Sequence, residues 1–456
     1  MKSNTYLTRV CLFLLALTLS SCKGFIEVPS PINQLNANNV FTDDKTATAA
    51  IVGMYSDMEF SVPISAYLTV LTGLSADELT SSLTNQDYLE FATNTYTRDN
   101  RYAAAVWAIY LNVYEANSCI QGIQNSKGLS PNTKNQLLGE ALFSRAFCYF
   151  YLVNLFGDVP LVTSTDYRVT DTIRRTPSTK VYQQIIADLI KAQTLLSSSY
   201  PTEQRVRPNL WTATALLSRV YLYTNKWTDA ESQASSIINS HSYSLPTDLP
   251  SVFQYNSDET IWQLMPVNPY INTQEAIFFI PGSTTQIPSY PLTTDLVNAF
   301  EPGDKRIAAW TGNNVIGSQV FYYPNKYKNA GGSPANEYHI VFRLAEQYLI
   351  RAEARMQRGN ITGAINDLNM VRSRTGLKAL STSQTPAKAA TAIQHERRIE
   401  LFAELGHRWL DLKRTATVDH VIGTLKPSTW VSTAALWPIP QDQRSANPSL
   451  TQNKGY

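Results

Sequence analysis

Cysteine is scarce in this chain, with four residues among 456. Cys11 and Cys22 fall in an N-terminal segment discussed below, which leaves Cys119 and Cys148, each on a helical pattern. No two cysteines have the short spacing of zinc ligands, so the sequence predicts no zinc site. A disulfide between Cys119 and Cys148 is compatible with an exported protein, but two separate buried thiols are favoured.

Motifs for catalysis are also missing. The chain has only five histidines and contains no G-x-S-x-G sequence, no P-loop, no G-x-G-x-x-G fingerprint and no Cys/His nucleophile pattern. The D-x-[DN]-x-[DN]-G pattern of a calcium loop is absent as well. The sequence therefore predicts a binding protein and not an enzyme, with no metal and no cofactor.

The chain has no marked excess of charge of either sign. It carries 38 basic and 36 acidic residues, and without residues 1–21, which contain Lys2 and Arg9, the numbers are 36 and 36. A protein that binds nucleic acid or another polyanion usually has a strong positive excess. Nucleic acid is therefore not an expected partner.

Long apolar runs are limited to the N-terminal segment. The run 10–19 has about ten residues, too few to span a bilayer core of about 30 Å as a helix. It ends in Leu19-Ser20-Ser21-Cys22, which resembles the lipobox of bacterial lipoproteins; an ordinary signal peptide followed by a cysteine is the alternative. We expect a signal peptide over 1–21, lipid attachment at Cys22 and an extended tether over 22–38.

Helical periodicity dominates the rest of the chain. A helix-hairpin pattern occurs at 212–238 and again at 345–372, with Ala230 of the first copy matching Ala364 of the second. This arrangement resembles tetratricopeptide pairs, in which small residues let two helices approach closely. The two copies are not in tandem, so a simple solenoid is not predicted. Further helices are expected at 41–58, 102–124, 133–157 and 180–197.

Two regions lack this periodicity. Residues 59–100 are polar and aromatic and are expected to form a long loop. Residues 241–340 are rich in proline, glycine and asparagine, with short strands expected in EAIFFI and SQVFYY.

We therefore predict a mainly α fold, in which tetratricopeptide-like helix pairs form a scaffold beside an irregular, loop-rich subdomain with a few short strands. One module is expected over 39–456. Its parts are a scaffold of 39–240 and 341–415, an irregular subdomain of 241–340 and a C-terminal tail of 416–456.

The most densely charged stretch is HERRIELFAELGHRWLDLKR, residues 395–414. A zinc-protease helix needs its second histidine four residues after the first, but position 399 is isoleucine. Acids alternating with arginines favour a structural network over a catalytic carboxyl pair. We expect Glu396, Arg397, Glu400 and Arg408 to pair within the scaffold, with Arg351 or Glu353 as further partners.

Aromatic residues next to amides and carboxylates are the remaining candidates for ligand binding. Sugars stack on flat aromatic faces and bond to nearby polar groups. Tyr88, Asn94 and Tyr96, with Asp77 upstream, provide this combination in one region. A second region provides it through Trp310 and Tyr323.

Several longer motifs resemble the SusD-like (RagB/SusD) family of outer-membrane nutrient-binding lipoproteins. They are RAFCYFYLVNLFGDVPL (145–161), RLAEQYLIRAEA (343–354), ERRIELFAELGHRWLDLKR (396–414) and LWPIPQDQRSANPSLTQNKGY (436–456). The resemblance covers essentially the whole chain after the signal segment. One departure is Lys23-Gly24-Phe25, which lacks the acidic cluster often seen after the lipid-attached cysteine of surface-exported relatives.

The resemblance implies a lipid-anchored protein on the outer membrane, facing the exterior, without catalytic activity. Its implied ligand is an oligosaccharide, and its implied partner is a SusC-like TonB-dependent transporter. The family's binding aromatics match the regions 77–96 and 290–323, which adds Tyr290 to the candidates above. The alternatives are a peptide-binding member of the same family and, from a different class, a surface glycoside hydrolase.

Overall fold

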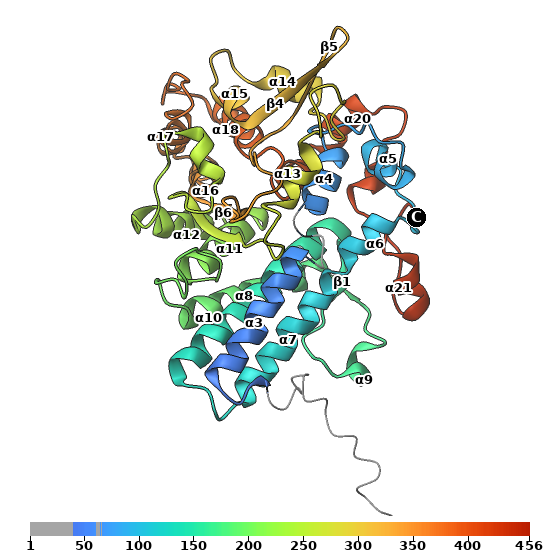
Figure 1. Ribbon diagram of the computed structural model, residues 1–456, viewed down its shortest axis with the longest axis vertical. Coiled ribbons are helices and arrows are strands. Elements are labelled where there is room, and N and C mark those ends of the chain that lie inside the picture. Colours follow the sequence, from blue (N-terminus) through green and yellow to red (C-terminus); the bar gives the residue numbers. More distant parts are fainter. Residues whose placement is uncertain (1–39, 61–63, 65) are drawn as a thin grey trace, which may run out of the picture.

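The structure is a computed structural model that describes residues 40–60, 64 and 66–456 (Figure 1). The expected signal peptide, the lipid-attachment residue Cys22 and the tether lie outside these residues. No helix in the described part of the chain is long and apolar enough to cross a membrane.

Most of the described chain is helical, and one set of helices builds the scaffold. These are α3 (Asp44–Phe60), α7 (Ile109–Asn125), α8 (Pro131–Phe156), α10 (Ser178–Leu195), α11 (Leu210–Tyr223), α12 (Trp227–Asn239), α16 (Leu344–Gln357), α17 (Ile361–Arg372) and α18 (Pro386–Glu400). From α7 to α17 each helix of this set packs on the next, and α3 covers α7 and α8 (Figure 1).

The other elements are short and lie mainly around the upper part of the scaffold in Figure 1. The helices are α4 (Ala66–Ser75), α5 (Gln86–Thr93), α6 (Arg101–Trp107), α9 (Tyr167–Thr170), α13 (Gln274–Phe279), α14 (Thr294–Ala299), α15 (Arg306–Trp310), α19 (His407–Arg414), α20 (Val418–Leu425) and α21 (Gln441–Ala446). The strands are β1 (Val159–Pro160), β2 (Arg175–Thr176), β3 (Thr260–Leu264), β4 (Thr311–Ile316), β5 (Gln319–Pro324) and β6 (His339–Arg343).

The strands form three separate antiparallel pairs: β1 with β2, β3 with β6, and β4 with β5. The pair β3–β6 joins the two ends of the irregular region, because β6 leads directly into α16. The pair β4–β5 is a hairpin in which Thr311 faces Pro324, and it projects from the top of the molecule in Figure 1.

Local sequence signals explain the ends of the long buried helix α8. Ser130 caps its start through a bond from the Thr133 amide, and Pro131 occupies the first turn, where a missing N–H costs nothing. Gly157 ends it with a positive φ of 73°, which a side chain would disfavour. This helix is buried along most of its length and forms the centre of the core.

The two helix-hairpin copies fold as expected, as α11–α12 and α16–α17. Ala230 and Ala364 are fully buried at the helix contacts, which lets each pair close tightly. Although more than a hundred residues separate the copies in sequence, α12 packs against α16. The copies therefore stack in space as neighbouring layers, and the irregular region is an excursion between them.

Both predicted thiols are buried and free of any disulfide. Cys119 lies on α7 and Cys148 on α8. Burial raises the pKa of Cys119 to about 12, so its thiol stays protonated and unreactive at neutral pH.

Two predictions of local structure are wrong. Residues 59–100 are not a long loop, because α4 and α5 form there and contribute to the core. The segment EAIFFI is helical, as α13, and not a strand. Caps explain both differences: Asn85 accepts from the Asp87 amide at the start of α5, and Thr273 accepts from the Ala276 amide at the start of α13. The strand predicted in SQVFYY is confirmed as β5.

The charged stretch 395–414 is not one continuous helix. Helix α18 ends at Glu400, and α19 begins at His407. Between them Ala403, Leu405 and Gly406 have positive φ values of 49°, 44° and 78°. Glu404 therefore lies in a turn and does not continue a helical row of acids.

Two helical glycines provide a test of how closely the N-terminal part of α3 and its lead-in pack on α7. A Cβ at Gly122 would lie 2.1 Å from the ring of Phe41, whereas a Cβ at Gly53 would meet nothing within 4 Å. We expect Gly122→Ala to lower the free energy of unfolding by about 1–3 kcal/mol through overpacking. Gly53→Ala should raise it by about 0.5–1 kcal/mol through helix propensity. Urea unfolding followed by circular dichroism measures both, and equal effects of the two changes would contradict this packing.

Candidate functional site

The structure brings together the two regions that the sequence singled out for ligand binding. Residues 77–82 run antiparallel beside residues 288–293. The Thr80 amide donates to the Pro291 carbonyl at 2.8 Å, and the Thr293 amide donates to the Glu78 carbonyl at 2.9 Å. The Leu292 amide in turn donates to the Tyr322 carbonyl of β5 at 2.8 Å. The early helices, the later loop and the hairpin are therefore joined through their backbones.

Next to this junction lies a cluster of six aromatic rings, which we call the aromatic cluster. Its members come from α4, α5, α6, α13 and the loop after α13; they are Tyr67, Tyr88, Tyr102, Phe278, Phe279 and Tyr290. Tyr88 is stacked on Tyr102 with ring centroids 4.3 Å apart, and Tyr67 meets the edge of Phe278 at 5.1 Å. Offset and edge-to-face contacts of this kind fix ring orientation.

The aromatic cluster has a buried base and a partly open surface. Tyr88, Phe279 and Tyr290 are buried, whereas Tyr67, Tyr102 and Phe278 keep part of their surface exposed. Partly exposed rings held by a rigid base can receive the apolar face of a flat ligand with little loss of side-chain entropy.

The seven candidate residues named from the sequence are mostly buried, and of these Tyr88 and Tyr290 belong to the aromatic cluster. Asp77, Tyr88, Asn94, Tyr96, Tyr290 and Trp310 are 5% exposed or less, and only Tyr323 is half-buried. A buried ring presents no face to a ligand in solution. In this structure six of the seven are therefore buried, and only Tyr323 keeps part of its surface exposed.

Trp310 and the Asn94–Tyr96 pair have clear internal partners. Trp310 donates its indole N–H to the Leu249 carbonyl at 3.0 Å, and the Lys326 ammonium lies 4.9 Å from the centre of its ring. Asn94 bonds the Ser75 carbonyl, the Tyr96 hydroxyl and the Lys426 ammonium, which closes the end of α4. Sequence alone could not separate such internal polar roles from ligand binding, because the residue types are the same.

The partly exposed members Tyr67, Tyr102 and Phe278 are the ones that sequence reasoning missed. Tyr102 begins a pattern that the sequence presents as core helix, and Phe278 lies in the segment interpreted as a strand. The available signal was the aromatic density of both regions, which indicated the neighbourhood but not the individual rings.

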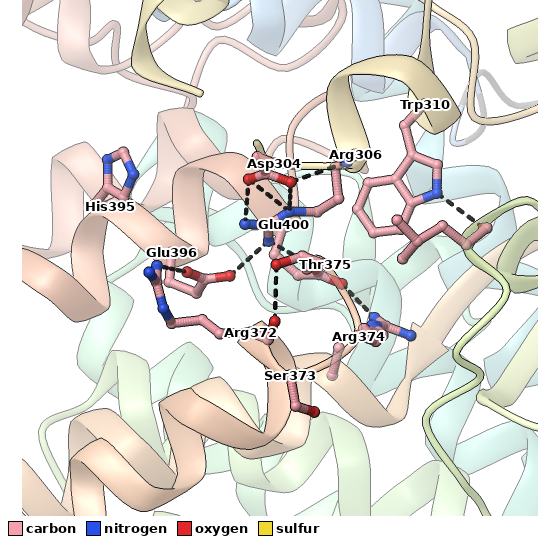
Figure 2. A network of polar contacts seen from close by, with 12 residues as sticks. Asp304, Arg306, Trp310, Arg372, Ser373, Arg374, Thr375, His395, Glu396 and Glu400 are labelled. Atoms are coloured by element: carbon pink, nitrogen blue, oxygen red, sulfur yellow. Dashed lines mark hydrogen bonds and ion pairs between the residues drawn. The ribbon is translucent and has the colours of Figure 1, made fainter. Parts of the chain in front are cut away.

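The charged stretch forms a buried ionic network (Figure 2). Glu400 accepts hydrogen bonds from Arg306 at 2.8 Å, from Arg343 at 2.6 Å and from Arg374 at 2.6 Å. Glu396 accepts from Arg306 at 2.6 Å and from Arg372 at 3.0 Å. The prediction that these acids pair within the scaffold is confirmed.

The other expected partners differ in part. Arg397 bonds Asp411 at 2.7 Å and lies 4.0 Å from Glu353, whereas Arg351 bonds Asp367 and takes no part in this network. Arg408 reaches out of the scaffold and bonds Asp77 at 2.7 Å.

The network supports the candidate site through Asp77. Arg398 and Arg408 both bond its carboxylate, at 2.9 and 2.7 Å, so α18 and α19 hold the segment 77–82 in place. Burial favours the neutral form of Asp77, but these two arginines outweigh it and lower its pKa. Next to it, burial and the charge of Asp77 raise the pKa of Glu78 to about 8. Glu78 is therefore largely uncharged at neutral pH, although Arg408 and Arg398 partly oppose this rise.

The two histidines of the charged stretch do not form a metal site. His407 is buried in the core, where desolvation lowers its pKa well below the usual value. His395 is one-third exposed at the edge of the network, 3.7 Å from Glu301 (Figure 2). Within the described residues, no group of three or more His, Cys, Asp or Glu side chains is placed to hold a metal ion.

Two family models match the chain. A model described as "Starch-binding associating with outer membrane" matches residues 25–222, and a model described as "SusD family" matches residues 289–456. Together they cover both the early helices and the charged stretch with its C-terminal tail.

Individual relatives cover most or all of the chain. A SusD-like protein P38 of Formosa agariphila is 26% identical, with 100% of each chain covered. A SusD-like protein of Bacteroides ovatus is 23% identical, with 87% of this chain and 80% of that protein covered.

Solved structures have the same fold. A SusD superfamily protein from Bacteroides vulgatus has a TM-score of 0.82 and 21% identity, covering 91% of this chain and 100% of the other. A structure described as a laminarin binding SusD-like protein has a TM-score of 0.75 and 23% identity, covering 91% and 100%. These likenesses confirm the predicted mainly α fold.

The ionic network predicts a strong and pH-dependent effect of removing Glu400. Because Glu400→Ala leaves three buried guanidinium groups short of a partner, we expect the free energy of unfolding to fall by about 3–5 kcal/mol. The arginines hold the pKa of Glu400 below its ordinary value of 4.5. The stabilisation that Glu400 provides is therefore present above this ordinary pKa and declines as the pH falls below it. The difference in free energy of unfolding between the wild-type protein and Glu400→Ala should become smaller in acid. Denaturant titrations at several pH values measure this.

Glu301→Ala is the matched control, because Glu301 bonds Arg372 in the same network but its side chain is 38% exposed. We expect it to cost less than about 1 kcal/mol. Similar losses for the two variants would show that the buried charges of Glu400 are not what stabilises this region.

Proposed function

The chain belongs to the SusD-like family, and from this we propose that it captures oligosaccharides at the aromatic cluster and passes them to a SusC-like TonB-dependent transporter. Members of this family are generally glycan-binding proteins of nutrient uptake. The relative described as laminarin binding supports a carbohydrate ligand for this chain as well.

The observation that carries the proposal is the partly open surface of Tyr67, Tyr102 and Phe278. Sugar rings have apolar C–H faces that pack on aromatic rings, and their hydroxyls bond to short polar side chains. Exposed hydroxyl and amide side chains occur on the segments next to α5 and α13: Ser82, Thr84 and Gln86 lie before or at the start of α5, and Ser283, Thr284 and Gln286 lie in the loop after α13.

The carboxylates of this region favour binding over hydrolysis. A glycosidase needs two carboxyl groups that face the substrate, one of them free to donate a proton. Glu396 and Glu400 are fully buried, and each is bonded to at least two arginines. Glu78 has the raised pKa of a general acid, but it is only 2% exposed and lies beneath the surface.

We further propose that the protein is held on the outer membrane by a lipid on Cys22, outside the described residues. The chain enters the described region at the lower end of the scaffold in Figure 1, where Phe41 lies against Gly122 of α7. Helices α4, α5 and α13, which carry rings of the aromatic cluster, lie in the upper half of the view, and the β4–β5 hairpin lies at its top. An anchor at the N-terminus would therefore place the site at the end of the molecule remote from the attachment point.

Removing one ring from the proposed surface should weaken glycan binding without unfolding the protein. We expect Tyr102→Ala to reduce affinity at least about tenfold, which corresponds to about 1.4 kcal/mol, because it removes a stacking face and the support of Tyr88. Tyr102→Phe keeps the ring and should bind nearly as well. Calorimetry against the best ligand of a glycan panel, with circular dichroism to confirm folding, measures this.

Tyr114→Ala is the control, because Tyr114 is 55% exposed on α7, away from the aromatic cluster. Unchanged affinity of a folded Tyr102→Ala protein would move the site elsewhere. Binding of peptides but of no glycan would replace the proposal with the peptide-binding alternative.

The anchor is tested separately. We expect Cys22→Ala to prevent lipid attachment, so that the protein no longer sediments with outer-membrane vesicles, while the purified protein keeps its glycan affinity. Membrane fractionation with radiolabelled fatty acid measures lipid attachment, and calorimetry of the purified variant measures its glycan affinity. Co-purification from detergent extracts tests for the transporter partner. A Cys22→Ala protein that remains lipid-labelled would contradict the anchor.

A further inference from the structure

The segments that build the aromatic cluster contain no basic residue over long spans. No Lys, Arg or His occurs at 46–97 or at 242–304. These spans supply α4, α5, α13 and the paired segments 77–82 and 288–293. The hairpin span 307–325 also has none. Among the described residues of α4, α5, α6 and α13, Arg101 is the one basic residue. It lies at the start of α6, next to Tyr102.

Arg101 already has a carboxylate partner. Its guanidinium bonds Asp87 through two nitrogens, at 2.8 and 2.6 Å. The ordinary positive charge of this side chain is therefore balanced on the protein itself. A negatively charged ligand would have to displace Asp87 to use it.

Carboxylates, in contrast, are frequent in these spans. Glu90 bonds Thr97 and Asn100, and Glu275 faces His339 at 3.0 Å. Asp77 and Asp295 share Arg398. These acids are all either buried or ion-paired, and they offer nothing to a ligand anion.

Arg101 of α6 is paired, and the exposed residues of α13 and the following loop are uncharged. They include Ile277, Ser283, Thr284 and Gln286. Such groups match the C–H faces and hydroxyls of a sugar. A carboxylate or sulfate group, in contrast, loses its hydration on binding and needs an Arg, a Lys or several N–H donors in return.

We infer that the ligand of this site is an uncharged oligosaccharide, and that polyuronates, sulfated glycans and acidic peptides are rejected because the described segments that build the site carry no unpaired basic side chain. This inference rests on the proposed function and names the chemical class of its ligand. Recognition therefore depends on stacking and hydroxyl contacts, and its strength should change little with salt.

The first experiment compares matched ligands on the full folded chain without its signal segment. Neutral oligosaccharides of glucose, mannose, galactose and xylose are titrated beside oligogalacturonates and sulfated galactans of the same length, at low and at high salt. We expect binding to at least one neutral ligand with an affinity nearly independent of salt, and affinities for the anionic ligands at least about tenfold weaker. Tighter, salt-sensitive binding of an anionic glycan would overturn the inference while leaving the proposed glycan capture intact.

The second experiment adds a cation to the surface. Ile277 on α13 is 42% exposed beside Phe278, and Val52 on α3 is 41% exposed on the scaffold. We expect Ile277→Lys to gain at least about tenfold in affinity for oligogalacturonate at low salt, and to lose this gain at high salt. Val52→Lys adds the same charge away from the site and should gain nothing.

The outcomes test the ligand class and the proposed function separately. Equal gains for Ile277→Lys and Val52→Lys, or no gain for either, would show that charge at this surface does not select the ligand. Failure of the folded protein to bind any glycan, neutral or anionic, would instead remove the proposed function itself.

Discussion

Glu400 accepts hydrogen bonds from three arginines that belong to different parts of the chain: Arg306 at the start of α15, Arg343 at the end of β6 and Arg374 after α17. Burying these charges is costly unless every one is paired, and their mutual attraction offsets that cost only in good geometry. The carboxylate therefore fixes where the irregular region meets the helix pairs. A hydrophobic contact would tolerate sliding at this junction, whereas directional ion pairs do not.

The same network sets the position of the binding surface. Arg398 of α18 and Arg408 of α19 extend the ionic network to Asp77. Lys326 lies directly after the β4–β5 hairpin, and its ammonium bonds the Glu400 carbonyl at 2.9 Å. The rings of the aromatic cluster are thus attached to the scaffold through charges on one side and through backbone pairing with the later loop on the other. The acids Glu396 and Glu400 of the charged stretch are fully buried and bonded to arginines, so the stretch supports the proposed site without facing it.

The long periodic helices and the pairing of Glu396 and Glu400 could be predicted from the sequence, because helical spacing and charge alternation are local patterns. The individual rings of the proposed binding surface could not be predicted. Trp310, Asn94 and Tyr96 have the residue types of a sugar site but bond inside the protein, whereas Tyr102 and Phe278 look like core and are partly open. Which side of a ring meets solvent depends on tertiary packing. The helical form of EAIFFI likewise depends on one cap at Thr273, which outweighs the strand preference of its aromatic and β-branched residues.

The pairing of residues 77–82 with 288–293 also has a consequence for the order of biogenesis. Thr80 and Pro291 are 211 positions apart in the chain, and their contact joins the early helices to the later loop beside the cluster in which Tyr67 contacts both Tyr102 and Phe278. A nascent or unfolded chain, even one that has already formed its early helices, contains only one side of that contact. Closing so long a loop has a large entropic cost that only the folded whole offsets. Affinity for the proposed ligand should therefore appear only with global folding, and a chain that is still unfolded during export would bind no ligand.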